Sequence, residues 1–150
     1  MKKISCLFIV SIIIVAGGAY AQSPETWVKA LDLTKDQMKI VMQEIGEIKD
    51  AKAGSETILT ASSQNDSSVI SVKQKVPVPA SVKVIFSKDE KVKQLTFSYK
   101  KLTPEIFKEV FPYQSDMLCT GTMRYTGKNA QVDLVIDQPN GSMVITVNRK

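Results

Sequence analysis

The sequence contains no histidine, the usual general base near neutral pH and the commonest side-chain ligand of transition metals. Catalysis by a Ser-His-Asp or Cys-His arrangement is therefore excluded within this chain. Zinc, copper and haem sites are disfavoured for the same reason. No other catalytic or metal-binding motif takes the place of the missing histidines, so the sequence predicts no catalytic residues, no metal ligands and no cofactor.

Cysteine is almost as scarce, with only Cys6 and Cys119 in the chain. Cys6 lies in an apolar N-terminal run, and a single remaining cysteine cannot form an internal disulfide. Cys119 alternates with Met117, Met123 and Tyr125, which places it on an apolar strand face, where a free thiol behaves as a small buried hydrophobe. A reactive thiol or an intermolecular disulfide is the alternative for Cys119. The fold is predicted to rest on packing alone.

The N-terminus has the three parts of a secretory signal. Lys2 and Lys3 are followed by an apolar run over residues 4–15, and an Ala-Tyr-Ala sequence ends at Ala21. The run is well short of the roughly 20 residues that cross a bilayer, so cleavage is favoured over a membrane anchor. Residues 1–21 are predicted to be a signal peptide and residues 22–150 a single exported domain, periplasmic or secreted, with no integral membrane span.

A long N-terminal helix is predicted over residues 35–53. Thr34 and Gln37 have the spacing of a capping box, and Gly54 offers a C-terminal stop. The segment before it is expected to form a short helical turn that packs on the domain. The stripe at helical spacing that supports the long helix consists of Met38, Val41, Met42, Ile45 and Ile48.

Beyond residue 56 the apolar period changes from helical to two, which is typical of half-buried antiparallel strands. A short helix capped by Thr103 and ended by Pro112 interrupts the strands, and Pro139-Asn140-Gly141 is a strong hairpin signal. Predicted strands cover residues 57–62, 70–78, 82–87, 94–99, 117–126, 131–137 and 142–148.

These elements predict an α+β fold. It has one antiparallel, twisted sheet of six or seven strands, with the long N-terminal helix packed on one face and the short helix before the last three strands. A sheet curved toward a half-barrel with an apolar interior is the second variant.

Lysines gather in one part of an otherwise mildly charged chain. Removal of residues 1–21 takes two lysines from a net charge of +5 and leaves +3, whereas residues 73–101 hold eight lysines against Asp89 and Glu90. Such a patch suits an acidic protein or another anionic surface. Protection of strand edges against aggregation is the alternative. The candidate binding residues are Lys73, Lys75, Lys83 and Lys100.

Two weaker catalytic patterns are better explained by structure. Ser98 and Lys101 have the Ser-x-x-Lys spacing of some penicillin-interacting hydrolases, but they lie in a strand rather than at the start of a helix. Asp133 and Asp137 share the polar side of one strand, about 13 Å apart by strand rise, which is too far for a catalytic pair.

Three functions remain open. The first is a non-enzymatic binding protein of the cell envelope or secreted space that contacts a protein or an anionic surface through its lysine-bearing strands. The second is a carrier of a small apolar ligand held between the helix and a curved sheet, lined by methionines. The third, a small enzyme that uses carboxylates or a lysine, lacks a pair of groups at a useful spacing. Nucleic acid is disfavoured because no aromatic ladder accompanies the lysines.

Overall fold

The computed structural model describes residues 24–70, 77–103, 120–137 and 139–150. Its helical elements are α2 (Pro24–Lys29), the 3-10 turn η2 (Ala30–Asp32) and α3 (Lys35–Gln43). The nine strands in these ranges are β1 (Ile48–Ala53), β2 (Glu56–Ser62), β3 (Val69–Ile70), β4 (Pro77–Val78), β5 (Ser81–Phe86), β6 (Val92–Tyr99), β7 (Thr120–Thr126), β8 (Ala130–Asp137) and β9 (Ser142–Arg149).

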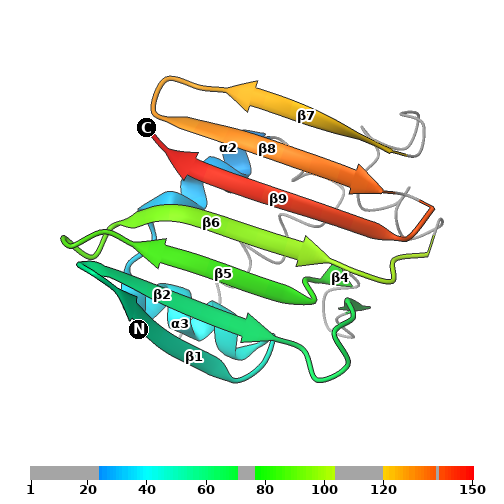
Figure 1. Cartoon of the computed structure of the whole chain (residues 1–150), viewed down its shortest axis with the longest axis horizontal. Coiled ribbons are helices and arrows are strands. Elements are labelled where there is room, and N and C mark those ends of the chain that lie inside the picture. The colour runs from blue at the N-terminus through cyan, green and yellow to red at the C-terminus, as the bar shows by residue number, and fades with distance from the viewer. Residues whose placement is uncertain (1–23, 71–76, 104–119, 138) are drawn as a thin grey trace, which may run out of the picture.

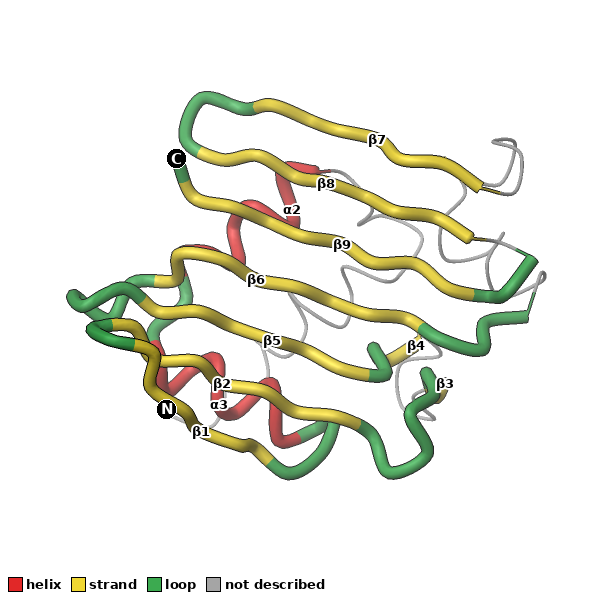
Figure 2. Tube along the Cα trace, viewed as in Figure 1, coloured by secondary structure: helices red, strands yellow, loops and turns green. Residues whose placement is uncertain are grey.

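Seven of these strands form one open antiparallel sheet, in the order β1-β2-β5-β6-β9-β8-β7 (Figure 1). β1 and β7 are therefore its two edge strands. The helices α2 and α3 lie on the same side of this sheet, α2 near β8 and α3 near β1 and β2 (Figure 2). The antiparallel sheet agrees with the alternating apolar pattern of the sequence.

The prediction of one long N-terminal helix over residues 35–53 is wrong. α3 ends at Gln43, and Ile48, which extends the apolar stripe at helical spacing, begins β1 instead. Residues 49–53 add no large apolar side chain to the stripe, so a longer helix would have nothing to bury. As a strand, the same residues gain a full ladder of partners from Glu56 to Thr60 on β2. In the described residues the fold is mainly a seven-stranded sheet with two short α-helices, rather than a sheet covered by a long helix.

The turn between β1 and β2 explains Gly54, which the sequence predicts to be a helix stop. Ala53 pairs with Glu56, so Gly54 and Ser55 form a two-residue hairpin loop. Gly54 has φ of 64°, and a glycine at the first central position is the requirement of a type II′ turn. Gly54 does end the element before it, but that element is the strand β1 and not a helix.

The N-terminal end of α3 is as predicted. The Gln37 amide donates to Thr34 Oγ1 at 3.2 Å, and the Thr34 amide donates to Gln37 Oε1 at 2.9 Å, which completes a capping box. The short helical segment before it also packs on the domain, because Trp27 and Leu31 are buried. Both short helices therefore fasten to the sheet at positions that the sequence marks.

The core fills the space between the helices and the sheet. Met38 and Met42 of α3 are fully buried in the core cluster. The strand residues of this cluster are every second residue along each strand. This alternation is the period-two pattern of the sequence, and it leaves one sheet face apolar. The largest buried strand side chains on that face are Leu59, Val82, Val84, Phe86, Leu95, Phe97, Tyr99, Val132, Leu134, Ile136, Met143, Ile145 and Val147.

Two other predicted elements need correction or fall outside the described ranges. The prediction of a single strand over residues 70–78 is wrong. Ile70 pairs with Pro77, and Val69 with Val78, in a small antiparallel ladder, so the two ends of this segment belong to different strands. The predicted short helix beyond Thr103 lies outside the described residues, as do residues 117–119 of the next predicted strand. The hairpin signal before β9 is confirmed: Gly141 has φ of 65°, and its carbonyl accepts a hydrogen bond from the Leu102 amide at 2.9 Å.

Candidate functional site

The side of the seven-stranded sheet that faces away from the helices is here called the outer face. Strand register places one row across all seven strands, and Lys83 is the third residue of this row, between Thr60 and Thr96. No aromatic side chain lies on this face in the described ranges, since Phe86, Phe97 and Tyr99 point into the core. The full row is Lys49, Thr60, Lys83, Thr96, Thr146, Asp133 and Arg124.

Lys83 is exposed, and its direct cross-strand neighbours are the uncharged Thr60 and Thr96. Among the described residues no carboxylate forms an ion pair with it. Lys49 lies two strands away in the same row, roughly 10 Å from Lys83 by strand spacing, and also has no ion pair within the described part of the chain. The two ammonium groups give this half of the outer face a positive charge with which no described carboxylate forms an ion pair.

Of the other predicted lysines, only Lys100 lies within the described residues, and it does not join Lys83. Lys100 follows the end of β6, and its Nζ lies 2.7 Å from Asp66 Oδ2, so it ties a loop to the strand. It is four residues from Thr96, roughly 13 Å along the strand. Lys73 and Lys75 lie outside the described residues. Lys49 was missed because its segment was assigned to a helix; a strand assignment would have placed it on this face.

The opposite half of the outer face carries a closed ion pair. Arg124 Nε on β7 lies 2.7 Å from Asp133 Oδ1 on β8, and Gln131 Nε2 donates to Asp133 Oδ2 at 3.0 Å. The hydrogen bond from Arg124 is the main reason why the pKa of Asp133 lies below its ordinary value. Asp137, the second acid on this strand, accepts a hydrogen bond from Asn140 Nδ2 at 2.7 Å. Both acids thus serve strand and turn contacts.

Protonation of Asp133 should weaken the fold. A carboxyl whose pKa is lower in the folded chain than the ordinary value of about 3.9 stabilises the fold above that pH, and the contribution is lost as the pH falls through the folded pKa. Urea unfolding at pH 6 and at pH 3 should therefore show a smaller acid-induced loss in Asp133→Asn than in the parent. Arg124→Gln should reduce the loss in the same way, and an unchanged loss in both variants would contradict this assignment.

A hollow of about 390 Å³ borders Lys49 on the outer face. Gly46 and Glu47 form one wall, where the chain enters β1, and Thr60 with Ser62 forms another on β2. Gln64 completes the lining. These groups offer hydroxyl, amide, ammonium and carboxylate contacts, so the hollow suits a polar side chain of a partner.

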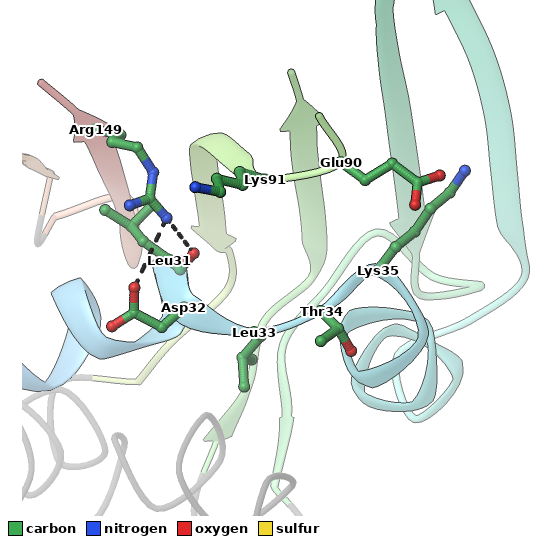
Figure 3. A pocket seen from close by; sticks show the side chains of 8 residues that line it. All are labelled: Leu31, Asp32, Leu33, Thr34, Lys35, Glu90, Lys91 and Arg149. Carbon is green, nitrogen blue, oxygen red and sulfur yellow. Dashed lines mark hydrogen bonds and ion pairs between the residues drawn. The ribbon is translucent and has the colours of Figure 1, made fainter. Parts of the chain in front are cut away.

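A second pocket, of about 330 Å³, opens at the end of the sheet where η2, the β5–β6 turn and β9 meet (Figure 3). Arg149 forms part of its lining. The guanidinium donates to the Leu31 carbonyl at 2.5 Å and to the Val92 carbonyl at 2.8 Å, and it lies 3.8 Å from Asp32 Oδ1. These hydrogen bonds of the Arg149 guanidinium join the helical segment to the sheet. The lining residues are Leu31, Asp32, Leu33, Thr34, Lys35, Glu90, Lys91 and Arg149.

Removal of that guanidinium should cost stability. Hydrogen bonds to a charged group contribute about 1.5–3 kcal/mol, so Arg149→Ala should lower the free energy of unfolding by about 2–3 kcal/mol. Lys91→Ala, which removes another cation from the same pocket, should change it by less than about 0.5 kcal/mol. Urea titration measures both. Equal effects would show that Arg149 acts only as a surface charge.

Comparison with protein-family models, curated proteins and solved structures finds no significant match. The functional assignment therefore depends on the geometry of the chain itself. In the described ranges, no three Cys, Asp or Glu side chains gather as metal ligands. None of the helices described is long and apolar enough to cross a membrane.

Proposed function

We propose that this chain is an exported, non-enzymatic binding domain whose outer face docks on an acidic surface of another protein. Lys83 is the centre of the contact and Lys49 supports it. The observation that carries the proposal is the position of Lys83: an exposed ammonium group on an interior strand, the third of seven, without a carboxylate partner among the described residues. Export rests on the signal-like sequence over residues 1–21.

The size of the outer face fits a protein partner. Seven strands about 4.8 Å apart, each with about seven residues at 3.3 Å, span roughly 700 Å². A standard protein interface buries about 800 Å² on each partner, so the outer face and its rim supply most of one interface.

The composition of the outer face also suits a protein. Ile58 on β2 lies directly opposite Ile85 on β5, and the exposed Val135 adds apolar surface on β8. Around them lie small hydroxyl and amide side chains, including Thr60 and Thr96. Apolar groups within a polar surround are the usual anatomy of such contacts.

A membrane surface fits less well. Basic residues near an anionic bilayer contribute about 1 kcal/mol each, so Lys49 and Lys83 together supply only about 2 kcal/mol. A nucleic acid strand would need aromatic platforms on which bases stack, and the described outer face has none.

The apolar carrier has less support than the binding domain. Met38, Met42 and Met143, three of the methionines that would line a ligand site, are fully buried against core side chains. Charged and polar residues make up most of the lining of both pockets described above. The carrier remains an untested alternative.

Site-specific photocrosslinking tests the proposal. A photoreactive amino acid at Thr96, beside Lys83 on the outer face, should yield one discrete protein adduct in the compartment where the chain resides. Lys83→Glu should reduce that adduct by about tenfold or more, because like charges placed against an acidic partner are strongly unfavourable. Lys88→Glu, in the exposed β5–β6 turn, is the matched control and should leave the adduct intact.

Two results would reject the proposal. One is an adduct whose yield is the same with Lys83→Glu and with Lys88→Glu, because the contact would then not depend on the charge of Lys83. The other is the absence of any protein adduct from Thr96. Circular dichroism of each variant checks that the sheet is unchanged, as the exposure of both lysines leads us to expect.

A further inference from the structure

β7 is an open edge. It pairs with β8 along its whole length, from Thr120 with Asp137 to Thr126 with Gln131, without a bulge. Six of its seven residues are exposed, and in the described ranges no strand pairs with its other side (Figure 1). A regular, exposed strand of this kind presents a row of backbone donors and acceptors to another chain.

The other edge strand, β1, carries charged side chains that protect it against pairing with another chain, unlike β7. β1 carries Lys49 on the outer face, and Asp50 and Lys52 lie on the side of the helices. Charges that point toward the core side of an edge strand prevent a second sheet from continuing there. β7 has glycine, methionine and tyrosine at the corresponding positions, and its one charged residue, Arg124, is paired with Asp133. Only β7 is suited to pairing.

The hydrogen-bond phase of β7 follows from its turn. The Gly127 amide donates to the Ala130 carbonyl at 2.8 Å, so these two residues form a bonded pair. Bonded and non-bonded pairs alternate along an antiparallel ladder. The odd-numbered residues of β7 therefore bond to β8, and the even-numbered ones direct their backbone groups away from it. Those with outward groups are Thr120, Thr122, Arg124 and Thr126.

We propose that β7 binds β7 of a second copy of this chain, antiparallel and in one register, with Met123 facing Met123 on a two-fold axis. In this register Thr122 faces the second copy's Arg124, and Thr120 faces its Thr126. All four residues with outward backbone groups then lie in hydrogen-bonded pairs, so the strand pairs with its copy along all seven residues. The two sheets become one continuous sheet.

The side chains are complementary in the same register. Gly121 faces the second copy's Tyr125, and a side chain built on Gly121 would meet nothing within 4 Å, so there is room for the ring. Aromatic residues opposite an edge glycine stabilise strand pairs in this way. Arg124 and its symmetry mate are diagonal neighbours, but each is already paired with Asp133 of its own chain. The register therefore places no uncompensated like charges together.

The two-fold axis runs perpendicular to the sheet, so both copies present their outer faces on the same side. This symmetry argues for a second copy over an unrelated strand: β7 is its own complement in charge, in side-chain volume and in hydrogen-bond phase. The β7 pairing does not depend on what the outer face binds, because Lys83 lies four strands away from β7.

Sedimentation of the purified chain between about 1 and 100 μM should show a monomer–dimer equilibrium. Thr122→Lys places a cation opposite the second copy's Arg124 and should raise the dimer Kd about tenfold, whereas Thr122→Glu should lower it severalfold. Thr122 is exposed, so neither change disturbs the monomer. A monomer at all these concentrations, or equal Kd values for the two variants, would overturn the proposal.

Disulfide trapping tests the register. Directly opposed residues of a non-bonded pair have Cα atoms about 4.5 Å apart, within the range of a disulfide. Met123→Cys should therefore form a dimer linked through residue 123, identified by peptide mapping. Thr126→Cys is the control, because its symmetry mate would lie six residues away along the strand. Equal trapping at residues 123 and 126 would show that the contact has a different register.

Discussion

Gly46→Ala should destabilise the fold by about 2–3 kcal/mol, because an added Cβ at Gly46 would lie 2.1 Å from the Ser62 carbonyl oxygen. The atom it meets is backbone, which cannot rotate away. The loop that leads into β1 would have to lift from the end of β2. Urea unfolding of the parent and the variant measures the loss.

The sign of this change separates two folds. In a helix that continued through residues 35–53, Gly46→Ala would stabilise by about 1 kcal/mol, since alanine is the better helix former. Gly121→Ala is the control: no atom lies within 4 Å of its added Cβ, so its effect should stay within about 0.5 kcal/mol. Stabilisation by Gly46→Ala would contradict the short α3 and the position of β1.

Val132→Ala should lower the free energy of unfolding by about 2 kcal/mol or more. Val132 is fully buried on the helix side of β8, between Tyr125 of β7 and Val147 of β9 in register. Loss of two methyl groups removes their transfer free energy and leaves a cavity that the rigid sheet fills only in part. Thermal and urea unfolding report the change.

Val135→Ala is the matched control in the same strand. Val135 is 50% exposed on the outer face, so the same chemical change should cost less than about 0.5 kcal/mol. A large difference between the two variants shows that one face of the sheet is core and the other is surface. Similar losses would mean that the outer face is covered, which would remove the docking surface on which the proposed function depends.

The sequence signals that proved correct are local ones. Thr34 and Gln37 make their capping contacts within one helical turn, and Gly141 supplies the positive φ that the last hairpin needs. The alternation of apolar and polar residues along β5, β6, β8 and β9 also predicts which face of the sheet is buried, because each of these strands has apolar side chains along one side. Such signals need no knowledge of which strands are neighbours.

The errors arose where long-range pairing decides the structure. Ile45 and Ile48 continue a helical stripe, but pairing with β2 holds Ile48 in a strand, opposite Ala61. Local propensity is a weak prior in such a case, because cross-strand partners supply the hydrogen bonds and the burial. This one error also hid Lys49, the second lysine of the outer face that has no ion pair among the described residues.

Arg149 shows the same limit at the second pocket. Its guanidinium bonds to carbonyls of Leu31 and Val92, which are 118 and 57 residues away in the sequence. Backbone carbonyls have no sequence signature, so nothing near Arg149 marks it as a structural contact. Lys83 was identified from its place in an alternating strand, but its isolation from carboxylates became visible only with the strand order.

Native mass spectrometry of the chain, released gently from its own compartment, tests most directly whether the outer face binds a protein. The expected result is a complex that contains the chain and a second protein species, and that disappears with Lys83→Glu but persists with Lys88→Glu. An added mass in the range of a lipid or another small apolar molecule, lost on denaturation and indifferent to Lys83→Glu, would contradict the account and favour a carrier.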